Sequence, residues 1–194
     1  AKIEKFDAVS NIDEIIETSD GIMVARGDLG IEVPYYDVPT IQKMLIKKSN
    51  AKGIPVITAT QMLLSMTQNE RATRAEISDV ANAVLDGTDI VMLSEESAVG
   101  ENPVNVVETM HNIIKQTEKI FDHEKRYKFT YLDEFDVIQA TVTKLADDLS
   151  ADGILSLTSS GNSARKMSRY RPITPLYTFA HDKQTLTGLT ALWG

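Results

Sequence analysis

The sequence predicts an α/β protein built from parallel strand–helix units, and three observations support this prediction. Short apolar runs recur at residues 21–25, 54–59 and 90–93, and a helical pattern follows each of them. One strand and its helix together take about 30–35 residues, which is typical of parallel βα units. The run Ile90–Leu93 is apolar at every position, which predicts a strand covered on both faces.

Four strand–helix units can be read in order along the first 120 residues. A strand tail at 1–4 and a helix over 12–18 form the first unit, and the three apolar runs begin the others. Each later helix has apolar residues three and four positions apart, and Asn102-Pro103 supplies a cap and a first-turn proline for the last one. The apolar stripes are Ile41, Met44 and Leu45; Ile77, Val80, Ala81, Val84 and Leu85, ending at Gly87; and Val106, Val107, Met110, Ile113 and Ile114. Four such units make half of an eight-stranded βα barrel and would not close by themselves.

Residues 121–134 change in character and predict a linker. They are charged and show no apolar period, so we expect a first domain at 1–120 and a second domain at 135–194. The second domain repeats the alternation, with elements predicted at 138–149, at 154–157, through Ala164 and Met167, at 176–179 and from Lys183. The chain begins directly on Lys2-Ile3-Glu4 and stops shortly after a helical segment. We therefore expect a fragment of a longer protein.

The composition excludes several classes of function. The 194 residues carry a net charge of −8, whereas proteins that bind nucleic acids or anionic membranes usually present a basic face, so we expect neither partner. The chain has no cysteine, which removes disulfides, thiolate metal sites and cysteine nucleophiles. It shows neither a signal peptide nor an apolar run of about 18 residues, and this pattern predicts a cytoplasmic protein.

Polar and charged residues follow each predicted strand directly. In a βα barrel the carboxyl ends of the strands converge on one mouth, where the active sites lie. The residues at these positions are Lys2 and Glu4, Gly27 and Asp28, Thr60 and Gln61, and Ser94, Glu95 and Glu96. We therefore expect these side chains to line one site.

The residue types at this mouth favour metal-assisted chemistry on an anion. Two carboxylates from neighbouring strands, Glu4 and Asp28, suit a hard cation such as Mg²⁺, which takes one or two protein carboxylates. Lys2 lies on the same face as Glu4 and can stabilise a developing oxyanion or a transferring phosphoryl group. The Thr60 hydroxyl and the Gly27 N–H can orient a substrate carboxylate. Two other interpretations stay open at this point: Asp28 as a helix N-cap, and Lys2 as a solvated side chain.

Several motifs resemble the pyruvate kinase family in order and spacing. They are Lys-Ile-Glu at 2–4, Gly-Ile-Met-Val-Ala-Arg-Gly-Asp-Leu-Gly at 21–30, Ala-Thr-Gln-Met-Leu at 59–63, and Arg-Ala-Glu with Ser-Asp-Val-Ala-Asn-Ala-Val-Leu-Asp-Gly at 74–87. Thr-Ser-Ser-Gly-Asn-Ser-Ala at 158–164 and Arg-Tyr-Arg-Pro at 169–172 are similar to the C-terminal domain of that family. The resemblance implies the last four units of a (βα)8, or TIM, barrel, followed by the first part of an α/β C-terminal domain.

The resemblance also implies a role for each residue of the site. Lys2 matches the lysine that stabilises phosphoryl transfer and the enolate intermediate, and Glu4 and Asp28 match the ligands of the catalytic Mg²⁺ or Mn²⁺. Gly27, Asp28 and Thr60 match the residues that contact phosphoenolpyruvate or pyruvate. The implied reaction transfers the phosphoryl group of phosphoenolpyruvate to ADP and gives pyruvate and ATP, in an enzyme that also uses K⁺ and forms a homotetramer.

A polar loop at 158–163 joins a predicted strand to a helix N-terminus, where N–H groups and hydroxyls can hold a phosphate. The resemblance implies a sugar-phosphate allosteric effector at this loop. The candidate ligands are Thr158, Ser159, Ser160, Gly161, Asn162 and Ser163. An ordinary serine and glycine helix cap is the other interpretation. Arg71 and Arg74 are expected at the mouth of the barrel or at a contact between subunits, and the resemblance favours the contact between subunits. A surface salt bridge is the other interpretation.

Two other functions stay open. The first is a different Mg²⁺-dependent barrel enzyme that acts on phosphoenolpyruvate or pyruvate, such as an aldolase or lyase, and needs no ADP. The second is a regulatory module that binds a phosphorylated metabolite at 158–163. We expect the fragment alone to be inactive, because the first barrel strands and the nucleotide contacts are missing. We also expect its open strand edges to favour a dimer.

Overall fold

The computed structural model describes residues 1–123 and 130–193 and confirms the α/β fold class. The predicted linker at 121–134 falls partly on residues 124–129, which lie outside the described residues. The chain divides into two compact units. These units comprise Ala1–Ser49 with Val56–Phe121, and Asn50–Pro55 with Asp122–Gly194.

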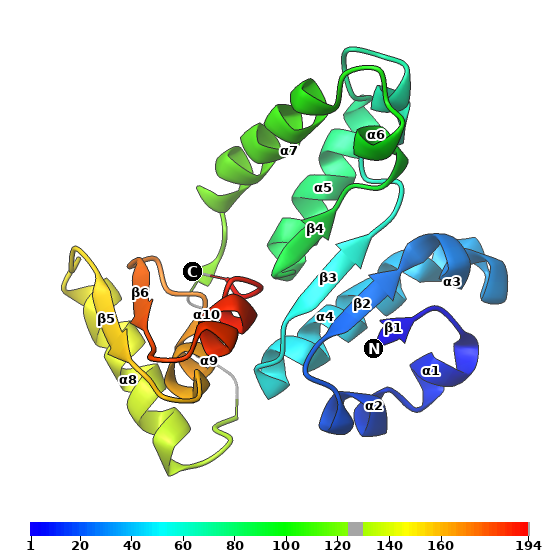
Figure 1. Cartoon of the computed structure of the whole chain (residues 1–194). Helices are drawn as coiled ribbons and strands as arrows, with labels where there is room; N and C mark the ends of the chain where they lie inside the picture. Colours follow the sequence, from blue (N-terminus) through cyan, green and yellow to red (C-terminus); the bar gives the residue numbers. More distant parts are fainter. Residues whose placement is uncertain (124–129, 194) are drawn as a thin grey trace. The chain divides into compact units, whose positions relative to one another are not determined.

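The first unit is built on a four-stranded parallel sheet whose strands follow one another in chain order (Figure 1). Strand β1 spans Lys2–Ile3, β2 spans Ile22–Ala25, β3 spans Val56–Ala59 and β4 spans Ile90–Met92. Each neighbouring pair is parallel. The carboxyl ends of the four strands therefore lie at one edge of the sheet, and this edge carries the candidate site.

Helices connect successive strands, as the apolar periods predict. The predicted ones are α2 (Ile12–Thr18), α4 (Val38–Lys52), α5 (Arg74–Asp86) and α7 (Pro103–Glu118). Short turns of helix that the sequence did not predict are α1 (Phe6–Ser10), α3 (Arg26–Glu32), α6 (Glu95–Ala98), η1 (Tyr35–Asp37) and η2 (Leu64–Thr67). Within the described part of the chain, no helix has the length and apolar character needed to cross a membrane.

The ends of two predicted helices are confirmed in detail. The Asn102 side chain accepts a hydrogen bond from the Asn105 backbone N–H at 3.2 Å, and Pro103 begins α7 directly after this cap. Helix α5 ends at Gly87, whose φ of 95° is the left-handed conformation that glycine adopts at low cost. Local chemistry alone therefore sets these boundaries.

A hydrophobic cluster anchors the segment that follows β3. Met62, Leu63 and Met66 are fully or almost fully buried. Their buried partners from α5 and α7 are Val80, Ala83, Val106, Met110 and Ile113. Burying a side chain of this size contributes about 1.5–3 kcal/mol. The segment that carries Thr60 into the site is therefore tied to two packed helices.

Strand β4 departs from the prediction that residues 90–93 are covered on both faces. Ile90, Val91 and Met92 are each only half-buried. The reason is the position of the strand, because β4 ends the described sheet and pairs only with β3. The described residues therefore bury only part of the apolar surface of β4.

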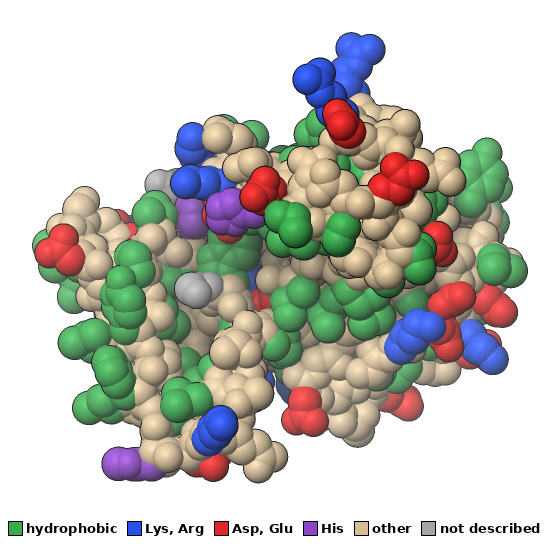
Figure 2. All heavy atoms as spheres, turned by 45° about the horizontal axis from the view of Figure 1, so that its top comes forward, with side chains coloured by type: hydrophobic (Ala, Val, Ile, Leu, Met, Phe, Trp, Pro, Cys, Tyr) green, Lys and Arg blue, Asp and Glu red, His purple; other side chains and the backbone are tan. Residues whose placement is uncertain are grey.

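The second unit is a smaller α/β arrangement. It contains α8 (Glu134–Asp148), β5 (Ile154–Leu157), α9 (Asn162–Ser168), β6 (Leu176–Phe179) and α10 (Lys183–Leu189). Strands β5 and β6 are parallel, and Ile154 lies opposite Leu176. Along β5, Ile154 is buried whereas Leu155 and Leu157 are exposed. Figure 2 shows hydrophobic side chains at the surface of this unit, on the left of the view.

Candidate active site

Lys2, Glu4 and Asp28 come together at the carboxyl edge of the sheet. Strand β1 pairs with β2 so that Lys2 lies opposite Met23, and α3 begins directly after β2 with Asp28 in its first turn. The Lys2 Nζ lies 2.5 Å from Glu4 Oε2 and 2.8 Å from Asp28 Oδ2. The three charged residues that the sequence places at neighbouring strand ends therefore form one cluster.

The charges in this cluster shift one another's proton affinities. The hydrogen bond from the Lys2 ammonium and its positive charge lower the pKa of the Asp28 carboxyl. In return, the hydrogen bonds to Asp28 and to Glu4 raise the pKa of Lys2. The side chains of Lys2 and Asp28 are 52% and 54% exposed, so water screens these interactions. Near neutral pH, Lys2 is cationic and Asp28 is anionic.

The donor set suits a hard divalent cation. Glu4 and Asp28 bind the same ammonium group, so their carboxylates lie within reach of one ion. Within residues 1–123 and 130–193, no group of three or more His, Asp and Glu side chains forms a candidate metal site. Mg²⁺ is commonly held by only one or two protein carboxylates, with water and substrate oxygens in its other positions. The pair therefore fits such an ion.

The other interpretations of Asp28 and Lys2 are wrong. The N-cap of α3 is Ala25, which makes no side-chain cap hydrogen bond, and Asp28 lies inside the helix. The Asp28 side chain binds Lys2 instead of the backbone N–H groups of its helix. Lys2 makes two ion pairs, so it is not merely solvated.

Thr60 and Gly27 also meet, and the backbone at Thr60 is strained. The Gly27 N–H donates a hydrogen bond to Thr60 Oγ1 at 2.9 Å. Thr60 and the following Gln61 have φ angles of 74° and 54°. The left-handed region is unfavourable for a β-branched residue such as threonine, and a residue held in such a region costs on the order of 1–3 kcal/mol. Backbone strain of this kind is often found at functional sites.

Two family profiles match the chain. One is described as "Pyruvate kinase, barrel domain" and matches residues 1–107, and the other is described as "Pyruvate kinase, alpha/beta domain" and matches residues 136–194. The chain belongs to the pyruvate kinase family. The resemblance seen in the sequence motifs is thereby confirmed.

Individual pyruvate kinases are similar over the whole chain. The pyruvate kinase of Bacillus licheniformis is 49% identical over 197 residues, and that of Lactobacillus delbrueckii subsp. bulgaricus is 48% identical over 199 residues. Each match covers 100% of this chain and 34% of the relative. A crystal structure of a pyruvate kinase from Cryptosporidium parvum superposes with a TM-score of 0.96 at 42% identity, covering 100% of this chain and 40% of that one. The chain thus spans about a third of the length of the curated relatives it matches.

Two acidic side chains, the buried Glu96 and the half-buried Glu76, support the segment around Thr60. The sequence places Glu96 among the residues that line the site and gives Glu76 no role. Both oxygens of the buried Glu96 accept backbone hydrogen bonds, from Leu63 at 3.1 Å and from Ser94 at 2.7 Å. Glu76 accepts from the backbone N–H groups of Ser65 and Thr73. The Thr-x-x-Glu spacing at 73–76 is the sequence signature of a capping box, and it could have revealed the role of Glu76.

The candidate phosphate loop lies between β5 and α9 in the second unit. Thr158 Oγ1 accepts a hydrogen bond from the Gly161 N–H at 2.9 Å. Gly161 is the N-cap of α9 and has a φ of 81°, so this position favours glycine. A cavity of about 490 Å³ lies beside the loop, lined by Leu157, Thr158, Ser159, Phe179, Ala180 and His181. The other candidate residues, Ser160, Asn162 and Ser163, do not line it.

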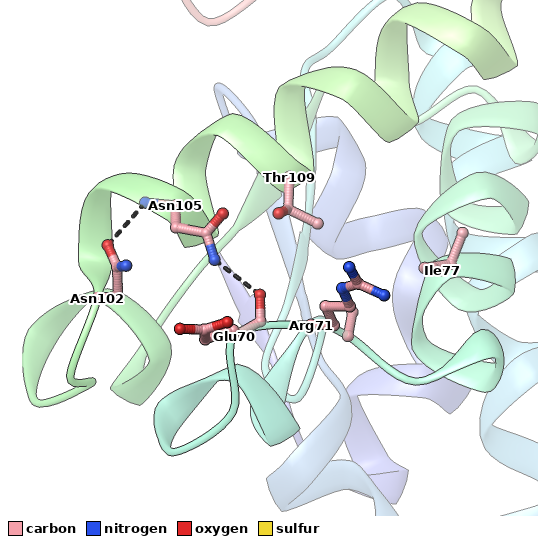
Figure 3. Close-up of a pocket in the computed structure, with 7 residues that line it drawn as sticks. Glu70, Arg71, Ile77, Asn102, Asn105 and Thr109 are labelled. Atoms are coloured by element: carbon pink, nitrogen blue, oxygen red, sulfur yellow. Dashed lines mark hydrogen bonds between the residues drawn. The ribbon is translucent and has the colours of Figure 1, made fainter.

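A separate pocket of about 540 Å³ lies in the first unit, between the turn before α5 and the first half of α7 (Figure 3). Arg71 and Thr109 line it, and the Asn105 side chain donates a hydrogen bond to the carbonyl of Glu70 at 2.7 Å. None of the predicted catalytic or substrate-binding residues lines this pocket. Arg71 therefore lies in this pocket and does not contribute to the Lys2 cluster.

Proposed function

We propose that the whole protein transfers the phosphoryl group of phosphoenolpyruvate to ADP and forms pyruvate and ATP. The observation that supports this most is the convergence of Lys2, Glu4 and Asp28, because it joins a metal-binding carboxylate pair to a cation suited to a transferring phosphoryl group. Membership of the pyruvate kinase family supports the same reaction.

Each residue of the cluster has a distinct task in this proposal. Glu4 and Asp28 hold Mg²⁺ or Mn²⁺, which, when bound, offsets the negative charge of the phosphoryl group and of the enolate oxygen. The Lys2 ammonium lies beside the same two carboxylates and stabilises the oxyanion that develops as the phosphoryl group leaves. Because the pKa of Lys2 is raised, this charge is present throughout the neutral range. K⁺ is a further cofactor in the proposal.

The substrate carboxylate binds beside Gly27, Asp28 and Thr60 in this proposal. The oxygen of the Thr60 hydroxyl already accepts the Gly27 N–H, so its own proton is oriented away from Gly27 and can be donated to the substrate. A Cβ at Gly27 would lie 3.4 Å from Thr60 Oγ1, and a longer side chain there would press on this hydroxyl. The glycine keeps the approach to Thr60 open.

The test is pyruvate formation by the whole protein from phosphoenolpyruvate, with ADP, the divalent metal and K⁺ each left out in turn. We expect turnover to require ADP and Mg²⁺ or Mn²⁺, and to fall when K⁺ is replaced by Na⁺. Enolate chemistry that proceeds without ADP would contradict the proposal and would favour the aldolase or lyase alternative.

We also propose that the 158–163 loop binds a sugar-phosphate effector. The cavity beside Thr158 and Ser159 supports this proposal. Titration calorimetry with sugar phosphates tests it, and we expect Thr158→Val to weaken binding, with Thr187→Val in α10 as the control. No heat with any sugar phosphate would remove the proposal.

For its assembly, we propose a cytoplasmic homotetramer for the whole protein, which family membership supports, and a dimer for the isolated chain. Light scattering separates these states from a monomer. A monomeric mass of the isolated chain, which weighs 21.5 kDa, would contradict the dimer.

A further inference from the structure

Arg26 is a nearly buried cation beside the candidate active site. Its side chain is only 11% exposed, and a charge with so little water around it needs close partners. The guanidinium donates hydrogen bonds to the carbonyl oxygens of Ala59 at 3.3 Å, Thr60 at 2.7 Å and Gln61 at 3.4 Å. It also pairs with Asp79 of α5, at 2.7 Å. One side chain thus holds three successive peptide groups.

These three peptide groups include the strained part of the backbone. Thr60 and Gln61 adopt left-handed φ angles, and strained backbone persists only where the surroundings hold it. The left-handed turn directs the carbonyls of Ala59, Thr60 and Gln61 to the same guanidinium. A planar guanidinium has five N–H donors in a fixed arrangement, and it can therefore serve these acceptors and a carboxylate at once.

Gly27, the residue after Arg26, binds the side chain of Thr60. Arg26 binds the Thr60 carbonyl, and Gly27, next in the chain, donates its N–H to the Thr60 hydroxyl. We infer that Arg26 is a positioning residue that fixes the backbone of Thr60 and thereby aims its hydroxyl at the phosphoenolpyruvate site. This inference rests on the proposed function for the identity of the substrate.

Asp79 orients the guanidinium. Both of its carboxylate oxygens lie close to Arg26 Nη1, at 2.8 and 2.7 Å, and the same nitrogen lies 3.4 Å from Gln42 Oε1. The remaining N–H groups are thereby directed to the carbonyls after β3. The conformation of Thr60 thus depends on a residue of α5 that does not touch it.

A double-mutant cycle on the whole protein tests the inference. The four proteins are the unmodified one, Arg26→Lys, Thr60→Val and the double variant. Lysine keeps the charge but lacks the planar arrangement of donors, and a displacement of about 1 Å at a catalytic site can cost up to about a hundredfold in rate. We expect Arg26→Lys to lower kcat/KM for phosphoenolpyruvate at least about tenfold in the unmodified background, and less than about threefold in the Thr60→Val background. Equal losses in both backgrounds would overturn the inference.

Two further variants separate positioning from general stability. Asp79→Asn keeps Arg26 but weakens its orientation, so we expect a smaller loss in the same direction. Lys43→Gln breaks the 2.5 Å ion pair to Asp86, which joins α4 to α5 and does not touch the segment after β3. We expect the kcat/KM of Lys43→Gln to stay within about twofold of that of the unmodified protein, because the loss of this ion pair lowers only the stability.

A crystal structure of Arg26→Lys gives a result that does not depend on activity. We expect the φ of Thr60 to leave the left-handed region and the distance from Gly27 N to Thr60 Oγ1 to exceed hydrogen-bond range. If Thr60 keeps its φ in this variant, the inference is wrong even in an active pyruvate kinase. If the unmodified protein lacks the activity but Thr60 moves, the proposed function fails and the positioning role stands.

Discussion

At the scale of single residues, the Lys2 ammonium determines how the site is charged. It contacts Glu4 and Asp28 together and keeps two carboxylates close that would otherwise repel each other. In the proposed function, Glu4 and Asp28 would hold a divalent metal ion, whose charge would offset their repulsion in place of Lys2 and leave Lys2 available to the substrate. We therefore expect metal binding to break the contacts of Lys2 with Glu4 and Asp28.

The pKa of Asp28 should report the presence of Lys2. The Lys2 ammonium lowers the pKa of Asp28, so this carboxyl favours the folded state above its unfolded pKa, and the contribution is lost as the pH falls through its lowered folded pKa. In Lys2→Met, we expect Asp28 to titrate at a higher pH. Carboxyl ¹³C shifts of the metal-free chain measure this. Asp182 serves as the control, because the Thr185 N–H lowers its pKa in the second unit and should still do so. An unchanged Asp28 titration in this variant would contradict the ion pair.

Asp28→Asn should weaken metal binding and activity together. The amide has the same shape but removes one of the two negative charges offered to the metal. We expect the Mn²⁺ affinity of the whole protein to fall about 10–100-fold and kcat/KM to fall at least as much. Glu32→Gln, an exposed position in the same helix, removes an equal charge and should leave both unchanged. If both variants lowered the Mn²⁺ affinity and kcat/KM equally, the effect would come from net charge, and Asp28 would not be a metal ligand.

The sequence predicted which charged residues meet but not how the backbone presents them. Lys2, Glu4 and Asp28 could be predicted because parallel strands end at a common edge. The left-handed backbone of Thr60 and its contacts with Arg26 could not be predicted. They depend on contacts between residues 33–35 positions apart in the chain, and no local pattern marks such contacts.

At the scale of elements, α5 supports the segment after β3 through its first turn. Thr73 and Glu76 form a capping box, and Glu76 also binds the N–H and hydroxyl of Ser65. Burial raises the pKa of Glu76, but the hydrogen bonds from Ser65 and Thr73 more than offset it, so its pKa is lowered. The helix start and the segment after β3 therefore share one carboxylate.

Removal of this cap should destabilise the first unit. We expect Thr73→Ala to lower the free energy of unfolding by about 1 kcal/mol, because an N3 backbone N–H loses its acceptor. Urea denaturation followed by circular dichroism measures the change. Ser78→Ala, an exposed position in the same helix, should be neutral or slightly stabilising, since alanine is the better helix former. A loss for Ser78→Ala equal to that for Thr73→Ala would contradict a specific cap.

Elements with an apolar stripe or a clear cap were predictable, and single turns of helix were not. Helices α5 and α7 span several turns, so their apolar stripes and caps are visible in the sequence. Helix α6 has only 4 residues, which is too short for a helical period to show, and α3 contains two glycines, Gly27 and Gly30, in its 7 residues, which disfavour a helix. The half-burial of β4 was missed for another reason, because a sheet edge is a property of the strand order and not of the strand itself.

At the scale of the whole molecule, the chain carries one part of the machinery of its family. It matches 34% of the length of the pyruvate kinases of Bacillus licheniformis and Lactobacillus delbrueckii subsp. bulgaricus. Its first unit supplies four adjacent strands, whereas a closed barrel needs eight. The Lys2 cluster is accordingly about half exposed, and water competes with its charges.

The isolated 194-residue chain should therefore be inactive. Electrostatic catalysis requires a preorganised site that excludes water, and an exposed cluster does not meet this requirement. We expect the purified chain to form no pyruvate from phosphoenolpyruvate and ADP in a coupled assay, while the whole protein does so under the same conditions. Turnover by the chain alone would show that these residues suffice for the site.

In the proposed reaction, Glu4 and Asp28 hold the catalytic metal next to Lys2. The most direct test is a crystal structure of the whole protein with Mn²⁺, located by its anomalous scattering. We predict one Mn²⁺ with a carboxylate oxygen of Glu4 and one of Asp28 at about 2 Å, and the Lys2 ammonium displaced from between them. An Mn²⁺ bound elsewhere, with Lys2 still bridging both carboxylates, would contradict this metal site.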